Sequence, residues 1–305
     1  VTIPEGLTSD QIVARLYENE ILSGDIAETP REGTLLPDTY KFERGTTRQQ
    51  IINTMQAAQR QILDQIWQRR SADLPIKSPQ ELVILASIVE KETGRADERT
   101  RVAGVFINRL MKRMKLQSDP TIVYGLVGGK GTLGRGILRS EIEMPTPYNT
   151  YVIEGLPPGP IANPGRAALE AVANPSRTKD LYFVADGSGG HAFAETYEQH
   201  QRNVSRWRQI ERSRPATTGD DVDRVLDADA PAQPAAPGQS GALDDGLNEL
   251  RGTAGAMPAR VRTVVGASGQ RASGFDASEG TEKDPLRNKS FDLTNPKTVP
   301  DLKQP

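Results

Sequence analysis

Residues 78–94 read SPQELVILASIVEKETG and decide the fold, because they predict an apolar helix that ends in two glutamates. Ser78, with Pro79 after it and Glu81 three residues on, has the form of a capping box with proline at the first helical position. The run that follows is apolar enough for a core helix, and Gly94 ends or bends it. We expect such a helix to lie at the centre of a domain. The question is then why it ends in two glutamates and whether either of them is buried.

Glu90 and Glu92 point in different directions on this helix. At roughly 100° per residue their side chains lie roughly 160° apart. Glu90 shares its face with a stripe of small side chains, Val83, Ala86 and Ser87. This stripe predicts the floor of a cleft, where apolar cover would raise the pKa of Glu90 toward that of a general acid. The alternative is a solvated charge at the end of an amphipathic helix. Glu92 is expected to face away from the cleft and to be dispensable.

Composition limits the chemistry. The 305 residues hold 38 basic and 40 acidic side chains, for a net charge of -2, which gives no reason to expect a nucleic-acid partner. The absence of cysteine excludes thiolate catalysis, disulfides and cysteine-ligated metals. The only histidines, His191 and His200, match no metal-binding spacing. We therefore expect a mechanism with no cofactor and no metal.

The chain contains no apolar run of about 18 residues, so no membrane-spanning segment is predicted. It shows no signal peptide, and it starts at Val1 rather than at a methionine. Our interpretation is that it is a fragment whose N-terminal targeting information has been removed.

The rest of the chain predicts an α+β fold, mainly helical, with a small β-sheet. Capping residues and apolar periodicity place further helices at about 8–19, 48–70, 96–114, 163–173 and 196–212. LYFVAD predicts a strand, GSGG its turn and HAF a short return strand. Residues 115–164 look irregular and are rich in Pro, Gly, Tyr, Asn and Thr, a composition typical of loops that carry sites.

Seven strings occur in one order: EGTLLPDTYKF, LASIVEKETG, FINRL, LQSDPTIVYG, PYNTY, GLPPGPIANPG and LYFVADGSGGHAF. Together they resemble the endolytic murein transglycosylase family, also called peptidoglycan terminases. The resemblance implies three parts. Residues 1–30 would be the end of a LysM-like linking subdomain that is truncated at its N-terminus, and 31–212 the catalytic domain. Residues 213–305, rich in Ala, Pro, Gly, Asp and Ser, predict a disordered tail.

The resemblance also implies a reaction, the cleavage of the β-1,4 bond between MurNAc and GlcNAc inside nascent glycan strands. The catalytic glutamate is assigned to Glu90 in the string IVEKET. Protonated Glu90 would protonate the leaving oxygen and then, as a carboxylate, take the proton of the sugar's own C6 hydroxyl. Closure of that oxygen on C1 gives a 1,6-anhydro-MurNAc end. A glycosidase that uses water normally needs two carboxyl groups, but this mechanism needs one.

The irregular region supplies amide, hydroxyl and ring surfaces suited to N-acetyl groups and sugar faces. The predicted substrate contacts are Gln117, Ser118, Asp119, Tyr124, Tyr148, Asn149, Tyr151, Asn163 and His191. Each has a structural alternative. Asp119 before Pro120 is typical of a turn, Asn163 of a helix cap, and the tyrosines of a core.

The implied partners are peptidoglycan glycan strands and, as candidates, peptidoglycan synthases. The implied location is the cell inner membrane, with a single-pass anchor absent from this chain and the catalytic domain in the periplasm. Two other functions stay open. One is a water-using muramidase with Asp119 or Asp97 as its second carboxylate. The other is a peptidoglycan-binding scaffold without activity.

Overall fold

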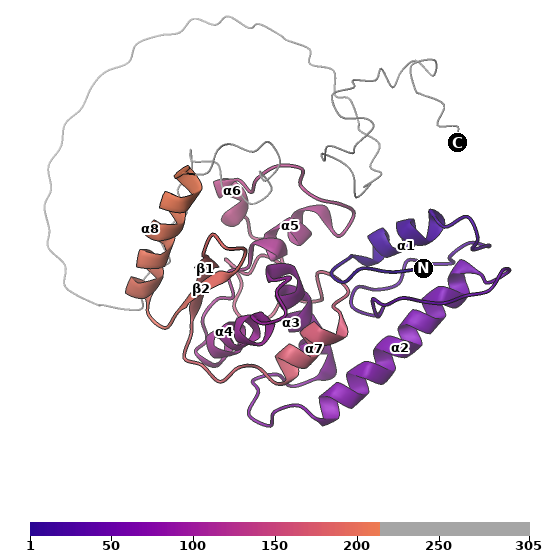
Figure 1. Cartoon of the computed structure of the whole chain (residues 1–305), viewed down its shortest axis with the longest axis horizontal. Coiled ribbons are helices and arrows are strands. Elements are labelled where there is room, and N and C mark those ends of the chain that lie inside the picture. The colour runs from indigo at the N-terminus through magenta and orange to yellow at the C-terminus, as the bar shows by residue number, and fades with distance from the viewer. Residues whose placement is uncertain (214–305) are drawn as a thin grey trace, which may run out of the picture. The chain divides into compact units, whose positions relative to one another are not determined.

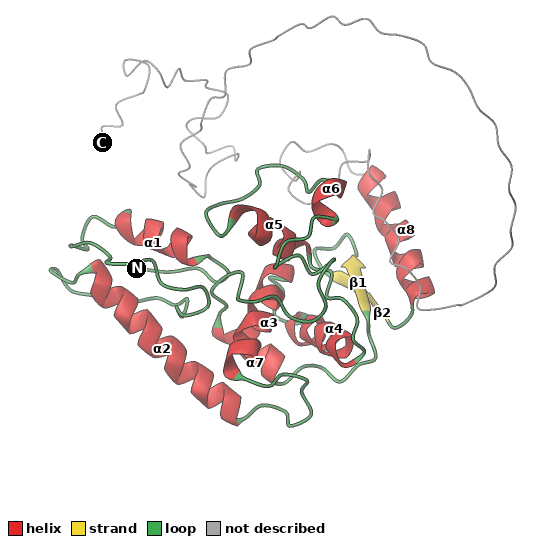
Figure 2. Cartoon of the chain, turned by 180° about the vertical axis from the view of Figure 1, so that it is seen from behind, coloured by secondary structure: helices red, strands yellow, loops and turns green. Residues whose placement is uncertain are grey.

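The computed structural model describes residues 1–213, which form eight helices and a two-stranded sheet (Figure 1, Figure 2). The elements are α1 (Ser9–Tyr17), α2 (Arg48–Gln68), α3 (Pro79–Glu92), α4 (Arg99–Met111), α5 (Asp119–Val127), α6 (Arg139–Ile142), α7 (Arg166–Ala173), β1 (Tyr182–Ala185), β2 (His191–Ala194) and α8 (Tyr197–Ser213). Helices with one small sheet confirm the predicted α+β class. The predicted tail, 213–305, lies outside the described residues except for Ser213. Among the described residues no helix has the length and apolar character needed to cross a bilayer.

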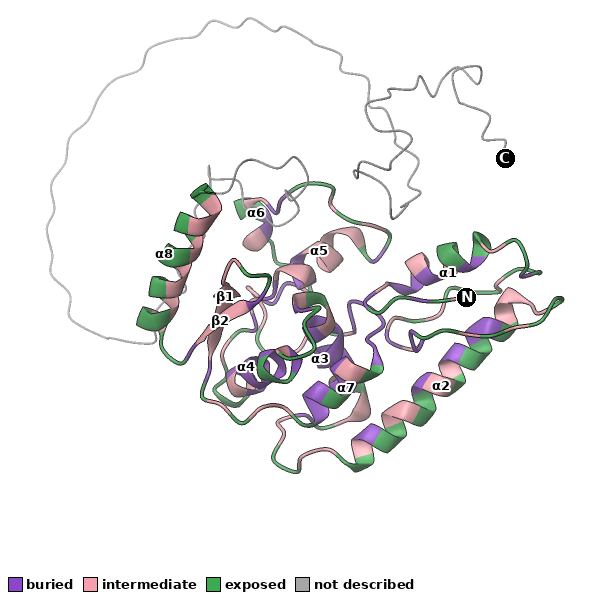
Figure 3. Cartoon of the chain, viewed as in Figure 1, coloured by how far each residue is buried: buried purple, intermediate pink, exposed green. Residues whose placement is uncertain are grey.

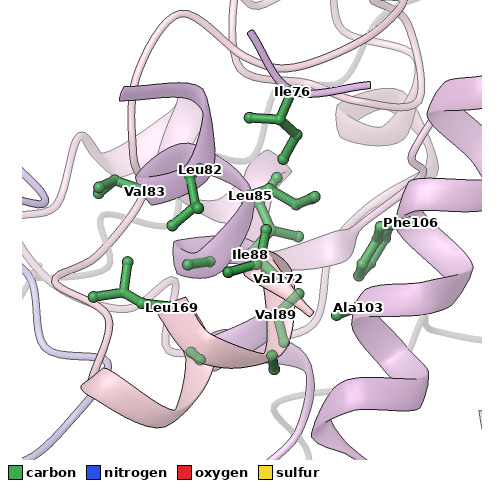
Figure 4. Close-up of a cluster of buried hydrophobic side chains, with 14 of the residues drawn as sticks. Ile76, Leu82, Val83, Leu85, Ile88, Val89, Ala103, Phe106, Leu169 and Val172 are labelled. Atoms are coloured by element: carbon green, nitrogen blue, oxygen red, sulfur yellow. The ribbon is translucent and has the colours of Figure 1, made fainter. Parts of the chain in front are cut away.

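Helix α3 is enclosed by the other helices. Every residue from Leu82 to Val89 is buried, and α2, α4, α5 and α7 pack around it (Figure 3). Figure 4 shows Leu85 of α3, Phe106 of α4 and Leu169 of α7 in one cluster. Full burial of one such side chain contributes about 1.5–3 kcal/mol. This cluster is therefore the main core and fixes the end of α3, where both glutamates lie.

Threonine and serine caps start the first three helices, and those at Thr8 and Ser78 were predicted. Thr8 and Thr47 form complete capping boxes at α1 and α2. At α3, the Ser78 hydroxyl accepts the Glu81 N–H at 3.2 Å, but the Glu81 carboxylate accepts the Lys77 N–H at 2.6 Å instead of that of Ser78. The predicted box at Ser78 is thus only half formed, although the helix starts at the predicted residue.

A second apolar cluster lies in the N-terminal part of the chain. Its buried members are Ile3, Ile12, Leu16, Leu22, Leu35, Ile51, Ile52 and Met55. The opening strand-like segment joins it by pairing with residues 38–40, since the Ile3 N–H donates to the Asp38 carbonyl at 3.0 Å. Helix α2 contributes to both clusters, because Ile66 near its other end packs into the main core. Packing therefore continues without a break across the predicted limit at residue 30.

The prediction that residues 115–164 are irregular is wrong for α5 and α6. Helix α5 contains β-branched and aromatic residues with weak helical preference, so tertiary packing of Thr121 and Ile122 stabilises it. Pro120 is tolerated in the first turn, and Gly128 ends the helix at φ 62°. Asn163 was also predicted to cap the next helix. The N-cap of α7 is Gly165 instead.

The predicted hairpin is confirmed. Strands β1 and β2 pair antiparallel, with Tyr182 opposite Ala194 and Ala185 opposite His191. Gly187 and Gly189 take φ values of 88° and 87° in the connecting turn, a conformation that favours glycine. Helix α8 packs along this hairpin (Figure 1).

Candidate active site

A cavity of about 400 Å³ lies beside the C-terminal end of α3, between the start of α5 and the β-hairpin. Five elements and two loops contribute to it. Its lining residues are Lys91, Glu92, Arg109, Leu116, Gln117, Asp119, Pro120, Tyr151, Phe183, Val184, Ala185 and His191. Among residues 1–213, a hollow of about 430 Å³ along α8 is lined by side chains of that helix alone. Because the first cavity gathers acidic, basic and aromatic groups from distant segments, it is the candidate active site.

Glu92, the last residue of α3, is held in this cavity by Ser118. The Ser118 hydroxyl donates to Glu92 Oε1 at 2.5 Å, and the Ser118 N–H donates to Thr150 Oγ1 at 2.9 Å. Gln117 has a φ of 51°, uncommon for a residue with a side chain, and its N–H donates to the Thr150 carbonyl. These bonds fix the chain that faces Glu92, so the carboxyl group has a defined orientation.

Glu90 lies outside the cavity. Its Oε2 accepts the Gly165 N–H at 2.8 Å, and Arg99 Nη2 lies 3.9 Å from its Oε1. Only 5% of the side chain is exposed. Burial raises the pKa of Glu90 above its ordinary value, against the lowering effect of the Gly165 N–H, while the negative charge of Glu5 raises it further. Glu90 is therefore a buried carboxyl group at the N-terminal end of α7.

The small-residue stripe next to Glu90 is not a cleft floor. The Ser87 hydroxyl accepts the Ile161 N–H at 3.0 Å, and Ser87 is fully buried. A Cβ atom added to Gly33 would lie 2.6 Å from Val83 and 2.7 Å from Pro160, so these segments are in close contact. The expectation of an open cleft here was wrong, because the chain's own residues 160–165 cover the stripe.

Asp119 and Tyr151 form a pair in the cavity lining. The Tyr151 hydroxyl donates to Asp119 Oδ1 at 2.5 Å. Burial raises the pKa of Tyr151 well above its ordinary value, and Asp119 raises it further. Arg109, which also lines the cavity, donates from Nε to the Leu181 carbonyl and from Nη1 to the Leu116 carbonyl, each at 2.7 Å. Burial lowers the pKa of Arg109.

Two groups of this site were missed at the level of sequence. Arg109 ties the segment before α5 to the start of β1, yet in FINRL it resembles any basic residue on a helix. Glu98 binds the imidazole of His191, with 2.8 Å between its Oε2 and Nδ1. Nothing near Glu98 in the sequence indicates a partner 93 residues away.

The structure therefore brings Gln117, Ser118, Asp119, Tyr151 and His191 together around Glu92. The other predicted contacts lie elsewhere. The rings of Tyr124 and Tyr148 pack on each other with their centroids 4.8 Å apart, outside the cavity lining.

Asn149 and Asn163 have no exposed surface. The Asn149 amide donates to the carbonyls of Ile142 and Met144 at 2.9 and 2.8 Å, and Asn163 Oδ1 accepts the Leu35 N–H at 3.0 Å. Both side chains hold loops together.

The first two thirds of the chain are similar to known proteins. The model of the YceG-like family matches residues 1–206. The endolytic murein transglycosylase of Streptococcus pneumoniae is 34% identical over 224 residues, which cover 66% of this chain and 39% of that protein. That of Bacillus subtilis is 35% identical over 185 residues, 60% of this chain and 49% of that protein.

The chain thus spans less than half the length of these two relatives. The crystal structure of a yceG-like protein from Listeria monocytogenes superposes with a TM-score of 0.51 at 32% identity, over 66% of this chain and 74% of that one. The resemblance seen in the sequence strings is confirmed by these matches. Because the family model covers about two thirds of the sequence, the chain belongs to the YceG-like family.

Proposed function

We propose that this chain is an endolytic murein transglycosylase that cleaves the β-1,4 bond between MurNAc and GlcNAc within nascent glycan strands. The product would be a 1,6-anhydro-MurNAc end, which terminates the strand. Support comes from the names of the relatives and from a cavity that combines carboxyl groups, a histidine and a tyrosine.

The observation that carries the proposal is the position of Glu92. It lines the cavity with Gln117, Asp119 and His191, whereas Glu90, the acid expected from the sequence, is 95% covered at its side chain and binds the Gly165 N–H. A general acid must reach the oxygen that it protonates, so its carboxyl group has to face the substrate. We therefore place the acid at Glu92 and keep Glu90 as the competing assignment.

In this mechanism the Glu92 carboxyl group protonates the glycosidic oxygen as C1 takes on oxocarbenium character. The C6 hydroxyl of the same MurNAc then bonds to C1 and loses its proton. In the simplest form the Glu92 carboxylate takes that proton and is restored as an acid. Because nucleophile and bond belong to one sugar, the cavity only has to hold the ring in the right conformation. The Ser118 hydrogen bond fixes the acid for both steps.

One specific observation favours a second candidate function. Asp119 lines the same cavity as Glu92, so a water-using muramidase with two carboxyl groups is chemically possible. Asp97, the other carboxylate considered for that role, lies outside the cavity lining and is 65% exposed beside Arg95. The muramidase alternative therefore depends on Asp119 alone, whose Oδ1 already accepts the Tyr151 hydroxyl.

Location and partners belong to the same proposal. Glycan strands are assembled outside the cytoplasmic membrane, so the folded part would act in the periplasm, held by an inner-membrane anchor outside this sequence. Residues 1–30 would end a LysM-like subdomain, 31–212 would be the catalytic domain, and peptidoglycan synthases would be partners.

The test is mass spectrometry of uncrosslinked glycan strands after incubation with the chain, with Glu92→Gln and with Glu90→Gln. We expect internal fragments with anhydro ends from the chain itself. Glu92→Gln should lose about 10²–10⁴-fold in rate, and Glu90→Gln, which keeps an acceptor for Gly165, should retain most activity. The reverse pattern would return the acid to Glu90. Reducing ends would identify a muramidase, and no cleavage at all would favour a binding scaffold.

A further inference from the structure

His191 is held by both oxygens of one carboxylate. Its Nδ1 lies 2.8 Å from Glu98 Oε2, and its backbone N–H donates to Glu98 Oε1 at 3.0 Å. Glu98 directly precedes α4, and His191 begins β2, so the pair joins the main helical core to the hairpin. The side chains are 17% and 15% exposed. Such a two-point contact fixes the backbone and the ring together.

Two aromatic rings set the plane of this imidazole. Phe183 meets it edge-on at a centroid distance of 5.2 Å and an interplanar angle of 83°. The centroid of the Phe193 ring lies 6.2 Å from that of the imidazole, with an interplanar angle of 63°. Phe183 also lines the cavity, so the ring stands at the cavity wall and not in the core behind it. With Glu98 at one edge and these rings beside it, the imidazole has a single defined orientation.

This arrangement selects one tautomer. A carboxylate beside Nδ1 places the proton of neutral imidazole on that nitrogen, so Nε2 is left as a hydrogen-bond acceptor. The same carboxylate stabilises the imidazolium that forms if Nε2 takes a proton. A group with these two properties, in a cavity that already holds a carboxyl group as acid, is suited to act as a base.

We propose that His191 is the base for the C6 hydroxyl and that Glu98 is its positioning residue. This inference rests on the proposed transglycosylase function. The Glu92 proton goes to the glycosidic oxygen as its bond to C1 breaks. O6 then bonds to C1, and the O6 proton goes to His191 Nε2, giving an imidazolium beside Glu98. Loss of that proton to solvent and protonation of Glu92 from solvent restore both groups, so protons balance over one turnover.

Other charged groups lie near Glu98 and Phe193 and in the lining of the cavity. Arg95 Nε lies 3.9 Å from Glu98 Oε1, and Arg101 of α4 stacks over Phe193 at 4.3 Å. The remaining charged side chains of the cavity are Lys91 and Glu92 of α3, Arg109 of α4 and Asp119 of α5. Charges of both signs are therefore present, and Glu98 is in direct contact with the ring.

The test is the pH dependence of kcat/KM for release of anhydro-ended fragments. The pH profile of the wild-type chain should be bell-shaped. Activity requires neutral His191, a form that is lost as pH falls, and protonated Glu92, a form that is lost as pH rises. His191→Gln should be about 10²–10⁴-fold slower and lack the limb at acidic pH. Glu98→Gln should fall about 10–100-fold with that limb displaced.

Asp97→Asn is the matched control, since it removes a neighbouring carboxylate that is exposed and paired with Arg95. It should keep the wild-type profile. His191→Ala should recover activity on addition of imidazole, which a purely structural role would not allow. Thermal unfolding followed by circular dichroism verifies that each variant is folded.

An unchanged bell and a rate within threefold for folded His191→Gln would overturn this inference, as would a lack of imidazole rescue. If the wild-type chain releases no anhydro ends, the proposed function itself fails. If it releases them and the His191 variants do not alter the profile, only the separate base is refuted.

Discussion

Replacing Glu32 by Gln should remove a pH-dependent part of the free energy of unfolding. Glu32 lies between the N-terminal segment and the loop before α7. Its Oε1 accepts the Ser9 N–H at 2.9 Å, and its Oε2 accepts the Asn163 amide at 3.3 Å. Burial raises the pKa of Glu32 from 4.5 to about 7, opposed by the Ser9 N–H and assisted by Asp10. The ionised form is thus the costly one in the folded chain.

The size and sign of the effect follow from this pKa. A pKa of about 7 against an ordinary value of 4.5 corresponds to about 3 kcal/mol, and solvent screening of this half-buried group reduces this to about 1–2 kcal/mol. A raised pKa in the folded state gives stability that is complete below pH 4.5 and is lost as pH rises through about 7. Relative to Glu32→Gln, the wild-type chain should therefore lose about 1–2 kcal/mol across that interval.

Urea unfolding followed by circular dichroism at several pH values between 4 and 8 measures this difference. The other titrating groups are common to both proteins and cancel in the comparison. Glu20→Gln, at an exposed position, serves as a control for the removal of one negative charge. A difference between wild type and Glu32→Gln that stays constant within about 0.5 kcal/mol from pH 4 to 8 would refute the reasoning.

Two further predictions concern the packing that positions the cavity. Gly104→Ala should destabilise the chain by about 1–2 kcal/mol in urea unfolding, because the added Cβ would lie 2.6 Å from the Ser176 carbonyl oxygen. This clash outweighs the gain in helix propensity. The control is Gly131→Ala, where the added Cβ would lie in open space and the free energy of unfolding should change by less than about 0.5 kcal/mol. Asn149→Ala should cost about 2–4 kcal/mol, since the fully buried Asn149 amide is a donor to the carbonyls of Glu141, Ile142 and Met144, which all lose it. A thermal unfolding midpoint for Asn149→Ala equal to that of wild type would contradict this.

Features set by neighbouring residues were predictable from the sequence. A cap and its partner lie three residues apart, as in Thr196 and Gln199, whose side chains exchange the bonds of a capping box at the start of α8. The hairpin needed only an apolar strand and a glycine-rich turn. These signals are local, so they hold whatever the rest of the chain does.

Features set by distant contacts were not predictable. Helix α5 combines Thr121, Ile122 and Val123, residues of weak helical preference, and exists because its buried face packs beside α3. Asn163 has the form of a helix cap, but its amide binds Leu7 and Glu32 more than 130 residues earlier. A local sequence pattern cannot reveal that a side chain is hydrogen-bonded to residues far away in the sequence.

The two glutamates of α3 show what helical periodicity cannot predict. The helical period places Glu90 and Glu92 on opposite sides, and they do lie apart, but a period says nothing about which side is covered. Small side chains suit both an empty cleft and the close approach of another backbone. Residues 160–165 make that approach and enclose Glu90. Glu92 is the last helical residue, and Thr93 after it is extended, so its side chain lies where the chain leaves the core. A stripe of small residues therefore indicates that something packs closely against it. Whether that is another segment of the chain or a substrate is established by the tertiary structure.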